Sequence, residues 1–175
     1  MWVDEKVIIE YYNLLKEINP KLHRTRNRPG VSGIFKKVKY GDCKYETNVG
    51  FPMETEQYGL VVNRFNSGKT QTAKYNTVKS DCYELLKNLI EYIDPDFEYN
   101  TITLNHNSIC KPHFDKLNKS PSLIIALGDF IGGELIVEEC LFDIKNKPLI
   151  FNGGVCKHAT NDFIGDRYTI IYYNI

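Results

Sequence analysis

Two histidines and one aspartate in the C-terminal half are the residues most able to hold a metal ion. His113 and Asp115 are two positions apart, so they face the same side of an extended strand. His158 comes later, after the turn signal Asn152-Gly153-Gly154, and could complete the site from another strand. Two imidazoles and one carboxylate on one face of an octahedral metal bind Fe(II) and leave coordination positions open. A histidine beside an aspartate also occurs without a metal, so this spacing predicts an iron site only together with further residues.

Arg167 and Thr169 are such residues. They are also two positions apart, on a strand expected over 167–173, and therefore share a face. A buried guanidinium with a hydroxyl beside it can hold a carboxylate bidentately. The apolar surroundings of this strand disfavour the alternative, an ordinary surface pair with Asp166. Together with the metal ligands, the pair predicts a pocket for a dicarboxylic keto acid that chelates iron at one end and binds Arg167 at the other.

The elements that position these residues begin with two helices. Apolar residues at helical spacing predict a helix from Asp4 to Ile18, with Asn19-Pro20 as its stop. A second helix is expected from about Asp81 to Ile93, where Asp81 and Glu84 have the spacing of a capping box. The region between the helices is expected to be irregular and basic.

From residue 99 onward the pattern predicts β-strands. Short alternating or apolar runs are separated by Gly, Asn and Asp turns, which is typical of a sandwich or barrel and not of a βαβ sheet. The expected strands cover residues 101–105, 122–127, 134–138, 147–151 and 167–173.

Composition excludes several classes of protein. The chain has 175 residues, 42% of them hydrophobic, and a formal net charge of zero, which fits one globular domain and no disordered chain. No apolar run is long enough to span a membrane, and acids stand where a signal peptide has basic residues. The five cysteines form no CxxC motif, which indicates a reducing compartment, so we expect an intracellular protein, cytoplasmic or nuclear. These cysteines are Cys43, Cys82, Cys110, Cys140 and Cys156.

The zero net charge hides an uneven distribution, with a basic region over 21–79 and an acidic stretch over 129–143. Lysines and arginines interleaved with aromatics suit a nucleic-acid groove, where cations meet phosphates and rings stack on bases. A solvated loop region and a groove for an acidic peptide are the alternatives. The aromatic residues of this region are Tyr40, Tyr45, Phe51, Tyr58, Phe65 and Tyr75, and its cations include Lys21, Arg24, Arg26, Arg28, Lys36, Lys37, Lys39, Lys44, Arg64, Lys69, Lys74 and Lys79.

The ordered set of motifs resembles the Fe(II)/2-oxoglutarate-dependent dioxygenase superfamily. His113-x-Asp115, His158 and Arg167-x-Thr169, with the segment 128–135 between them, carry the resemblance over roughly residues 99–175. It implies a mostly β fold with supporting α-helices, a double-stranded β-helix (jelly roll, cupin-like). One domain would span 1–175, with N-terminal helices and a substrate-facing region in 1–98 and the jelly-roll core in 99–175.

The same resemblance implies cofactors and residue roles. His113, Asp115 and His158 would be the iron ligands, Arg167 would hold the C5 carboxylate of 2-oxoglutarate, and Thr169 would assist it. The reaction would consume 2-oxoglutarate and O2, release succinate and carbon dioxide, and hydroxylate a substrate C–H bond. Asn105 is expected either to hydrogen-bond the cosubstrate or to satisfy a strand end.

Within the superfamily the chain is most similar to the TET/JBP-like branch, which oxidises the methyl group of pyrimidines in nucleic acid. Residues 105–118, 149–153 and 163–168 carry this similarity, and 28–33 loosely matches the substrate-facing segment of that branch. A prolyl or lysyl side-chain hydroxylase is the alternative, although its usual anchoring Lys is replaced by Arg167. A non-catalytic jelly-roll binding module is the third hypothesis.

Four remaining residues are expected outside the chemistry. His106 is interpreted as structural, His23 as exposed, and Glu134 as facing solvent or closing a turn. Cys156 is expected to be buried as a small hydrophobe. The oligomeric state and the target base or side chain do not follow from the sequence.

Overall fold

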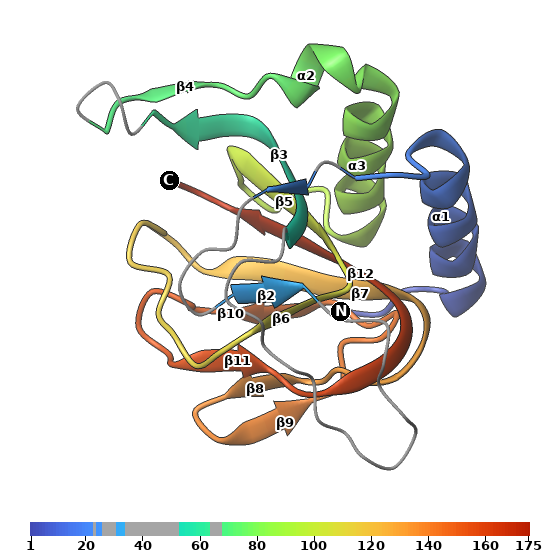
Figure 1. Ribbon diagram of the computed structural model, residues 1–175, viewed down its shortest axis with the longest axis vertical. Helices are drawn as coiled ribbons and strands as arrows, with labels where there is room; N and C mark the ends of the chain where they lie inside the picture. Colours follow the sequence, from blue (N-terminus) through green and yellow to red (C-terminus); the bar gives the residue numbers. More distant parts are fainter. Residues whose placement is uncertain (23, 26–30, 34–52, 64–67) are drawn as a thin grey trace.

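The computed structural model describes residues 1–22, 24, 25, 31–33, 53–63 and 68–175 (Figure 1). Its helices are α1 (Glu5–Ile18), α2 (Tyr75–Val78) and α3 (Ser80–Ile93). Its strands are β1 (Arg24–Thr25), β2 (Val31–Gly33), β3 (Met53–Val62), β4 (Thr70–Thr72), β5 (Thr101–His106), β6 (Ser108–Cys110), β7 (Ser122–Gly132), β8 (Leu135–Val137), β9 (Cys140–Phe142), β10 (Leu149–Phe151), β11 (His158–Thr160) and β12 (Phe163–Tyr173).

The two long helices form where the apolar periodicity predicts them. The side chain of Asp4 caps α1 by accepting a hydrogen bond of 2.9 Å from the backbone amide of Lys6. The capping box expected at the start of α3 is wrong, because the N-cap residue is Lys79 and no side chain caps the helix. The short helix α2 leads directly into α3, so Asp81 lies inside the first turn.

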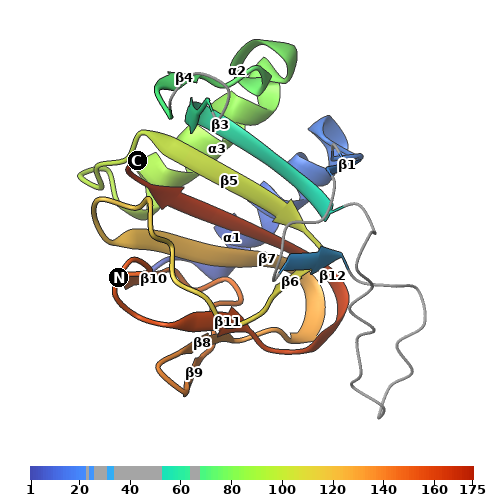
Figure 2. The ribbon, with the colours of Figure 1, turned by 60° about the vertical axis from the view of Figure 1, so that its left-hand side comes forward.

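A large antiparallel sheet, ordered β1-β3-β5-β12-β7-β10, forms the centre of the molecule. The strands lie side by side in Figure 2, with α1 and α3 behind them. The last strand in the chain, β12, occupies the middle and pairs with both β5 and β7. The main core lies between this sheet and the helices, around residues such as Ile8, Leu86 and Ile170.

The strand β3 corrects the expectation of an irregular segment over 53–62. It runs between β1 and β5 in the large sheet. The hydrophobic pattern does not reveal this strand, because one of its core-facing residues is the polar Glu56, which is 1% exposed. There Glu56 forms an ion pair with Lys79 and accepts hydrogen bonds from Tyr58 and Asn19.

A smaller layer covers the other face of the large sheet. It contains the strands β11-β8-β9 and the pair β2-β6. A second hydrophobic core, including Phe130, Leu135 and Phe163, lies between the two layers. Two antiparallel layers of this kind, with helices outside one of them, confirm the jelly-roll class expected from the sequence. None of the helices in the described part of the chain is long and apolar enough to cross a membrane.

Candidate active site

The backbone brings His113 and His158 face to face. Each residue donates its amide proton to the carbonyl oxygen of the other at 3.0 Å, which makes an isolated antiparallel bridge. This bridge connects the segment after β6 to the start of β11. The amide of Asp115 donates to the carbonyl oxygen of Gly153 at 2.8 Å, so the carboxylate is held on the same side.

The three side chains converge on one point. The Nε2 atom of His113 lies 3.3 Å from Oδ1 of Asp115, and Nε2 of His158 lies 3.3 Å from Oδ2. One donor atom from each residue falls within 4.8 Å of the others. This donor set and spacing fit one Fe(II) ion held by two imidazoles and a carboxylate.

Hydrogen bonds to the opposite ring nitrogens prepare both imidazoles for this role. The carbonyl oxygen of Lys111 lies 2.7 Å from Nδ1 of His113, and that of Cys156 lies 3.0 Å from Nδ1 of His158. A carbonyl oxygen only accepts, so each Nδ1 carries a proton. Each Nε2 hydrogen-bonds Asp115 while it is protonated and offers its lone pair to a metal once that proton is lost. Metal-binding histidines are commonly oriented by such bonds.

The Asp115 carboxyl is ionised despite its burial. Burial opposes its ionisation, but the hydrogen bonds from His113 and His158 outweigh it and hold the pKa of Asp115 well below its ordinary value of 3.8. Asn118 donates to Ser122 at 3.0 Å, and its Nδ2 atom lies 3.4 Å from Oδ2 of Asp115. The site therefore presents a negative charge where a cation would bind.

Arg167 is buried, and hydrogen bonds fix the direction of its guanidinium. Its side chain is 2% exposed, and its guanidinium lies against the rings of Phe130 and Phe163, at 5.5 Å and 5.1 Å from their centroids. Its Nη1 donates to Oγ1 of Thr169 at 3.0 Å, and its Nη2 donates to the carbonyl oxygen of Gly133 at 2.8 Å. A guanidinium held in this way is oriented before any ligand arrives.

Asn105 lies in the same cross-strand row as Thr169. Thr55 of β3, Asn105 of β5 and Thr169 of β12 are register partners. The hydroxyl of Thr55 donates to Oδ1 of Asn105 at 2.7 Å. The row thus extends from the Thr169 partner of Arg167 across three strands. Thr55 was missed in the sequence because β3 was not recognised as a strand.

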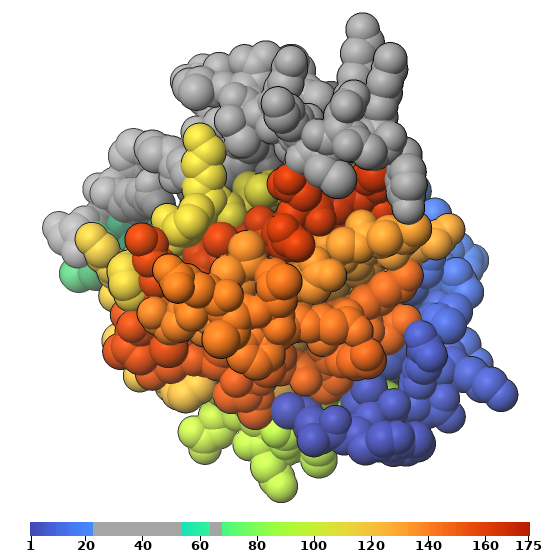
Figure 3. All heavy atoms as spheres, turned by 90° about the horizontal axis from the view of Figure 1, so that it is seen from below, coloured from blue at the N-terminus to red at the C-terminus, as the bar shows by residue number. Residues whose placement is uncertain are grey.

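A groove of about 680 Å³ runs from His113 and Asp115 along the sheet face. Its floor comes from β3, β5 and β12, and its far wall from the segment 71–75. Cys110 also lines it, and burial raises the pKa of this thiol to about 11, so the thiol is protonated at neutral pH. Figure 3 shows the molecule from below, where the C-terminal half, coloured orange to red, forms much of the surface and the N-terminal residues, coloured blue, lie at its edge.

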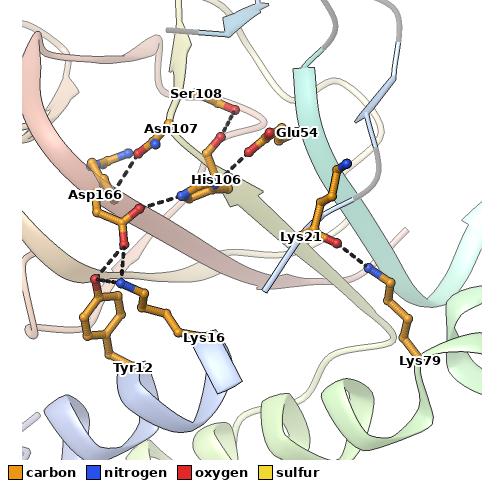
Figure 4. Close-up of polar contacts among 10 residues, drawn as sticks. Tyr12, Lys16, Lys21, Glu54, Lys79, His106, Asn107, Ser108 and Asp166 are labelled. Carbon is orange, nitrogen blue, oxygen red and sulfur yellow. Dashed lines mark hydrogen bonds and ion pairs between the residues drawn. The ribbon is translucent and has the colours of Figure 1, made fainter. Parts of the chain in front are cut away.

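The contacts of His106 are structural, as the sequence predicts. Its Nδ1 contacts Glu54 and its Nε2 lies 2.6 Å from Asp166, while Tyr12 of α1 donates to Asp166 at 2.6 Å (Figure 4). The imidazole stacks on Tyr168 with ring centroids 4.3 Å apart. The contacts connect α1 to three strands of the sheet.

The basic region over 21–79 is only partly described. Tyr58 is buried in the core and Lys79 forms the ion pair with Glu56, so neither serves a nucleic-acid surface. The segment 28–33 is described only from residue 31. Residues of this region that lie outside the described part are His23, Arg26, Arg28, Lys36, Lys37, Lys39, Tyr40, Cys43, Lys44, Tyr45, Phe51, Arg64 and Phe65.

Two of the remaining expectations concern residues near the site. Glu134 lies in the turn between β7 and β8 and accepts a hydrogen bond of 2.8 Å from Asn161, which lies in the turn between β11 and β12. Cys156 is partly buried and packs against the second core, in agreement with its expected role as a small hydrophobe.

Comparison with known proteins supports the fold. No protein-family model and no curated protein matches the chain. Among solved structures, NgTET1 in complex with 5mC DNA matches with a TM-score of 0.59 at 14% identity, over 98% of this chain and 69% of that one. An oxidoreductase of the 2OG-Fe(II) oxygenase family from Burkholderia pseudomallei matches with a TM-score of 0.57 at 14% identity, over 93% of this chain and 77% of that one. The chain therefore has the fold of the 2-oxoglutarate–Fe(II) oxygenases.

Proposed function

We propose that the protein is an Fe(II)- and 2-oxoglutarate-dependent dioxygenase, an oxidoreductase that hydroxylates a substrate C–H bond. The observation that carries this proposal is the convergence of His113, Asp115 and His158, with both Nε2 atoms prepared for a metal. The shared fold supports it. A non-catalytic binding module would have no use for two oriented imidazoles facing one carboxylate.

Each residue then has a defined task. His113, Asp115 and His158 hold Fe(II), Arg167 with Thr169 binds the distal carboxylate of 2-oxoglutarate, and Asn105 lies beside that cosubstrate. When these groups are bound, they supply a reaction in which O2 and 2-oxoglutarate give succinate, carbon dioxide and a hydroxylated substrate. A guanidinium can bind a carboxylate through two parallel N–H···O hydrogen bonds, which suits the distal carboxylate of a dicarboxylic keto acid.

The substrate we propose is a pyrimidine in nucleic acid, oxidised at its methyl group. Lys74 and Lys116 line the groove, and among its described lining residues Asp115 is the only acid. This charge balance suits a polyanion. One structural neighbour was solved with DNA that contains 5mC. A prolyl or lysyl side chain of a protein is the alternative substrate.

We further propose that residues 1–175 form one domain with an intracellular location. The strands β3 and β5, on either side of residue 98, pair in one sheet, which supports a single unit. Cys82, Cys110, Cys140 and Cys156 are free thiols, as a reducing compartment would keep them.

Succinate release tests the proposal. The protein would be incubated with Fe(II), 2-oxoglutarate and O2, together with oligonucleotides containing 5-methylcytosine or thymine, or with proline- or lysine-containing peptides. We expect succinate in stoichiometric amount with an oxidised pyrimidine. Succinate formed together with a hydroxylated peptide would show that the substrate is a protein side chain and not a pyrimidine. A complete lack of 2-oxoglutarate consumption would refute the enzyme class.

A further inference from the structure

The floor of the groove carries a second cross-strand row of polar side chains. Gln57 of β3 is the register partner of Thr103 of β5, two residues along each strand from Thr55 and Asn105. Two residues of a strand span about 7 Å. The second row is thus displaced from the row that leads to Arg167, and it lies where a substrate beside the cosubstrate would reach the floor.

Tyr173 of β12 connects this second row. The amide Nε2 of Gln57 donates to the phenolic oxygen of Tyr173 at 3.2 Å, and the hydroxyl of Thr103 lies 3.0 Å from the same oxygen. Gln57, Thr103 and Tyr173 all line the groove. Three strands therefore present a connected set of amide and hydroxyl groups, which contains donors and acceptors but no formal charge.

The rest of the groove lining differs from this row in chemistry. Phe114 and Leu117 are 43% and 61% exposed at the loop that follows β6, so they offer apolar surface to a ligand. Lys74 lies on the far wall of the groove, and Lys116 lies beside Phe114. The groove thus combines a neutral hydrogen-bonding floor, an apolar rim and two cations.

A nucleotide satisfies all three parts of this lining. Its base has a polar edge with donors and acceptors, its faces are apolar, and its phosphates are anionic. A proline ring carries no donor or acceptor that could hydrogen-bond Gln57 or Thr103, so it would make no use of the polar floor. A lysine side chain would be repelled by Lys74 and Lys116.

We infer that Gln57 and Thr103, with Tyr173 as the residue that orients them, form the specificity row that reads the polar edge of a nucleobase. The inference rests on the proposed function, because it places the base beside the proposed iron and 2-oxoglutarate sites. Gln57 and Thr103 contact the base, and the phenolic hydroxyl of Tyr173 fixes the positions of both side chains.

A binding measurement without turnover tests this inference. Single-stranded oligonucleotides labelled with fluorescein would carry either one 5-methylcytosine or an abasic site at the same position. Mn²⁺ and 2-oxoglutarate would occupy the site in place of the active iron complex. We expect the wild-type protein to bind the 5-methylcytosine oligonucleotide about tenfold more tightly or better, since a well-placed pair of base contacts discriminates by roughly that factor.

Three variants identify the side chains that distinguish the 5-methylcytosine oligonucleotide from the abasic one. Gln57→Leu and Thr103→Val, which keep side-chain size, should each bring the ratio of the two dissociation constants toward one. Tyr173→Phe should reduce the ratio less, because both polar side chains remain but lose their orienting hydroxyl. Thr70→Val is the matched control, since Thr70 is exposed on β4 outside the groove, and it should keep the wild-type ratio.

The outcomes separate this inference from the proposed function. A wild-type ratio of one, or an unchanged ratio in folded Gln57→Leu and Thr103→Val, would overturn the specificity row. If either of these variants fails to fold, Tyr173→Phe decides, because it removes a single oxygen atom. Failure of 2-oxoglutarate consumption with every substrate would instead refute the proposed function, and it is measured independently.

Discussion

At the scale of single residues, the candidate iron site requires a glycine at position 153, because a side chain there would meet two of its residues. A Cβ atom added there would lie 2.7 Å from Oδ2 of Asp115 and 3.1 Å from Cε1 of His158. Two proposed ligands would have to move apart to admit it. At the neighbouring Gly154, the nearest atom to an added Cβ is a flexible Asn152 oxygen at 3.3 Å.

We therefore predict that Gly153→Ala weakens Fe(II) binding by tenfold or more while the protein remains folded, since misplaced ligands cost metal affinity on that order. Gly154→Ala is the matched control and should bind iron as the wild type does. Metal affinity measured by competition with a chelator, alongside the melting temperature, checks this. Equal iron affinity in the two variants would contradict the proposed position of the metal.

A second prediction at this scale concerns Arg167 and the affinity for 2-oxoglutarate. Lys cannot reproduce the planar fork that donates to Thr169 and to the carbonyl of Gly133 while it packs against two phenylalanine rings. Arg167→Lys should therefore raise the dissociation constant for 2-oxoglutarate about tenfold or more and leave Fe(II) binding unchanged. Isothermal titration with each ligand tests this. Unaltered 2-oxoglutarate affinity would remove Arg167 from the cosubstrate site.

At the scale of elements, His106 connects α1 to the sheet and makes its attachment sensitive to pH. Burial alone would lower the pKa of His106, but hydrogen bonds with Asp166 and Glu54 outweigh it and raise the pKa above its ordinary value of 6.5. The hydrogen bond with His106 in turn lowers the pKa of Asp166. Tyr12 and Lys16 of α1 also contact Asp166.

The sign of the pH dependence follows from the raised pKa. The contribution of protonated His106 to the free energy of unfolding is fully present below pH 6.5 and is lost as pH rises through the folded-state pKa. The stability difference between the wild type and His106→Gln should therefore shrink above pH 6.5. Urea unfolding at a series of pH values measures it, and a difference that grows with pH would contradict this role.

The elements also explain which parts of the fold the sequence could predict. Helices α1 and α3 and the strands β5, β7, β8 and β12 carry recognisable apolar patterns, because each contributes buried residues to a core. The strand β3 carries polar residues on both faces, with Glu56 in the core and Thr55 and Gln57 in the groove. Its identity as a strand depends on partners distant in sequence, which no local pattern reveals.

At the scale of the whole molecule, the candidate site could be predicted in its ligands but only in part in its surroundings. The order and spacing of His113, Asp115 and His158 predict their convergence, although only His158 lies on a strand, β11, and the other two lie in the segment after β6. The groove row Gln57, Thr103 and Tyr173 needs three strands in register, and only the folded sheet supplies that register.

The position of β12 leads to a prediction for the whole chain. Its residues from 169 to 173 pair with β5, and 169 to 172 pair with β7, in the middle of the large sheet. A chain truncated after Tyr168 should therefore lose cooperative unfolding as well as activity, whereas one truncated after Tyr173 keeps both pairings and should stay folded. Circular dichroism with thermal melting checks this. A truncation after Tyr168 that kept full turnover would contradict the placement of Arg167 on a fixed strand.

The most direct test of the central claim is an anaerobic titration of the protein with Fe(II) and 2-oxoglutarate, followed by visible absorption. A keto acid that chelates iron held by His113, Asp115 and His158 gives a weak charge-transfer band. We predict this band for the wild-type protein at one iron per chain and its loss in His158→Ala. The lack of a band in folded wild-type protein at saturating iron and 2-oxoglutarate would contradict the account.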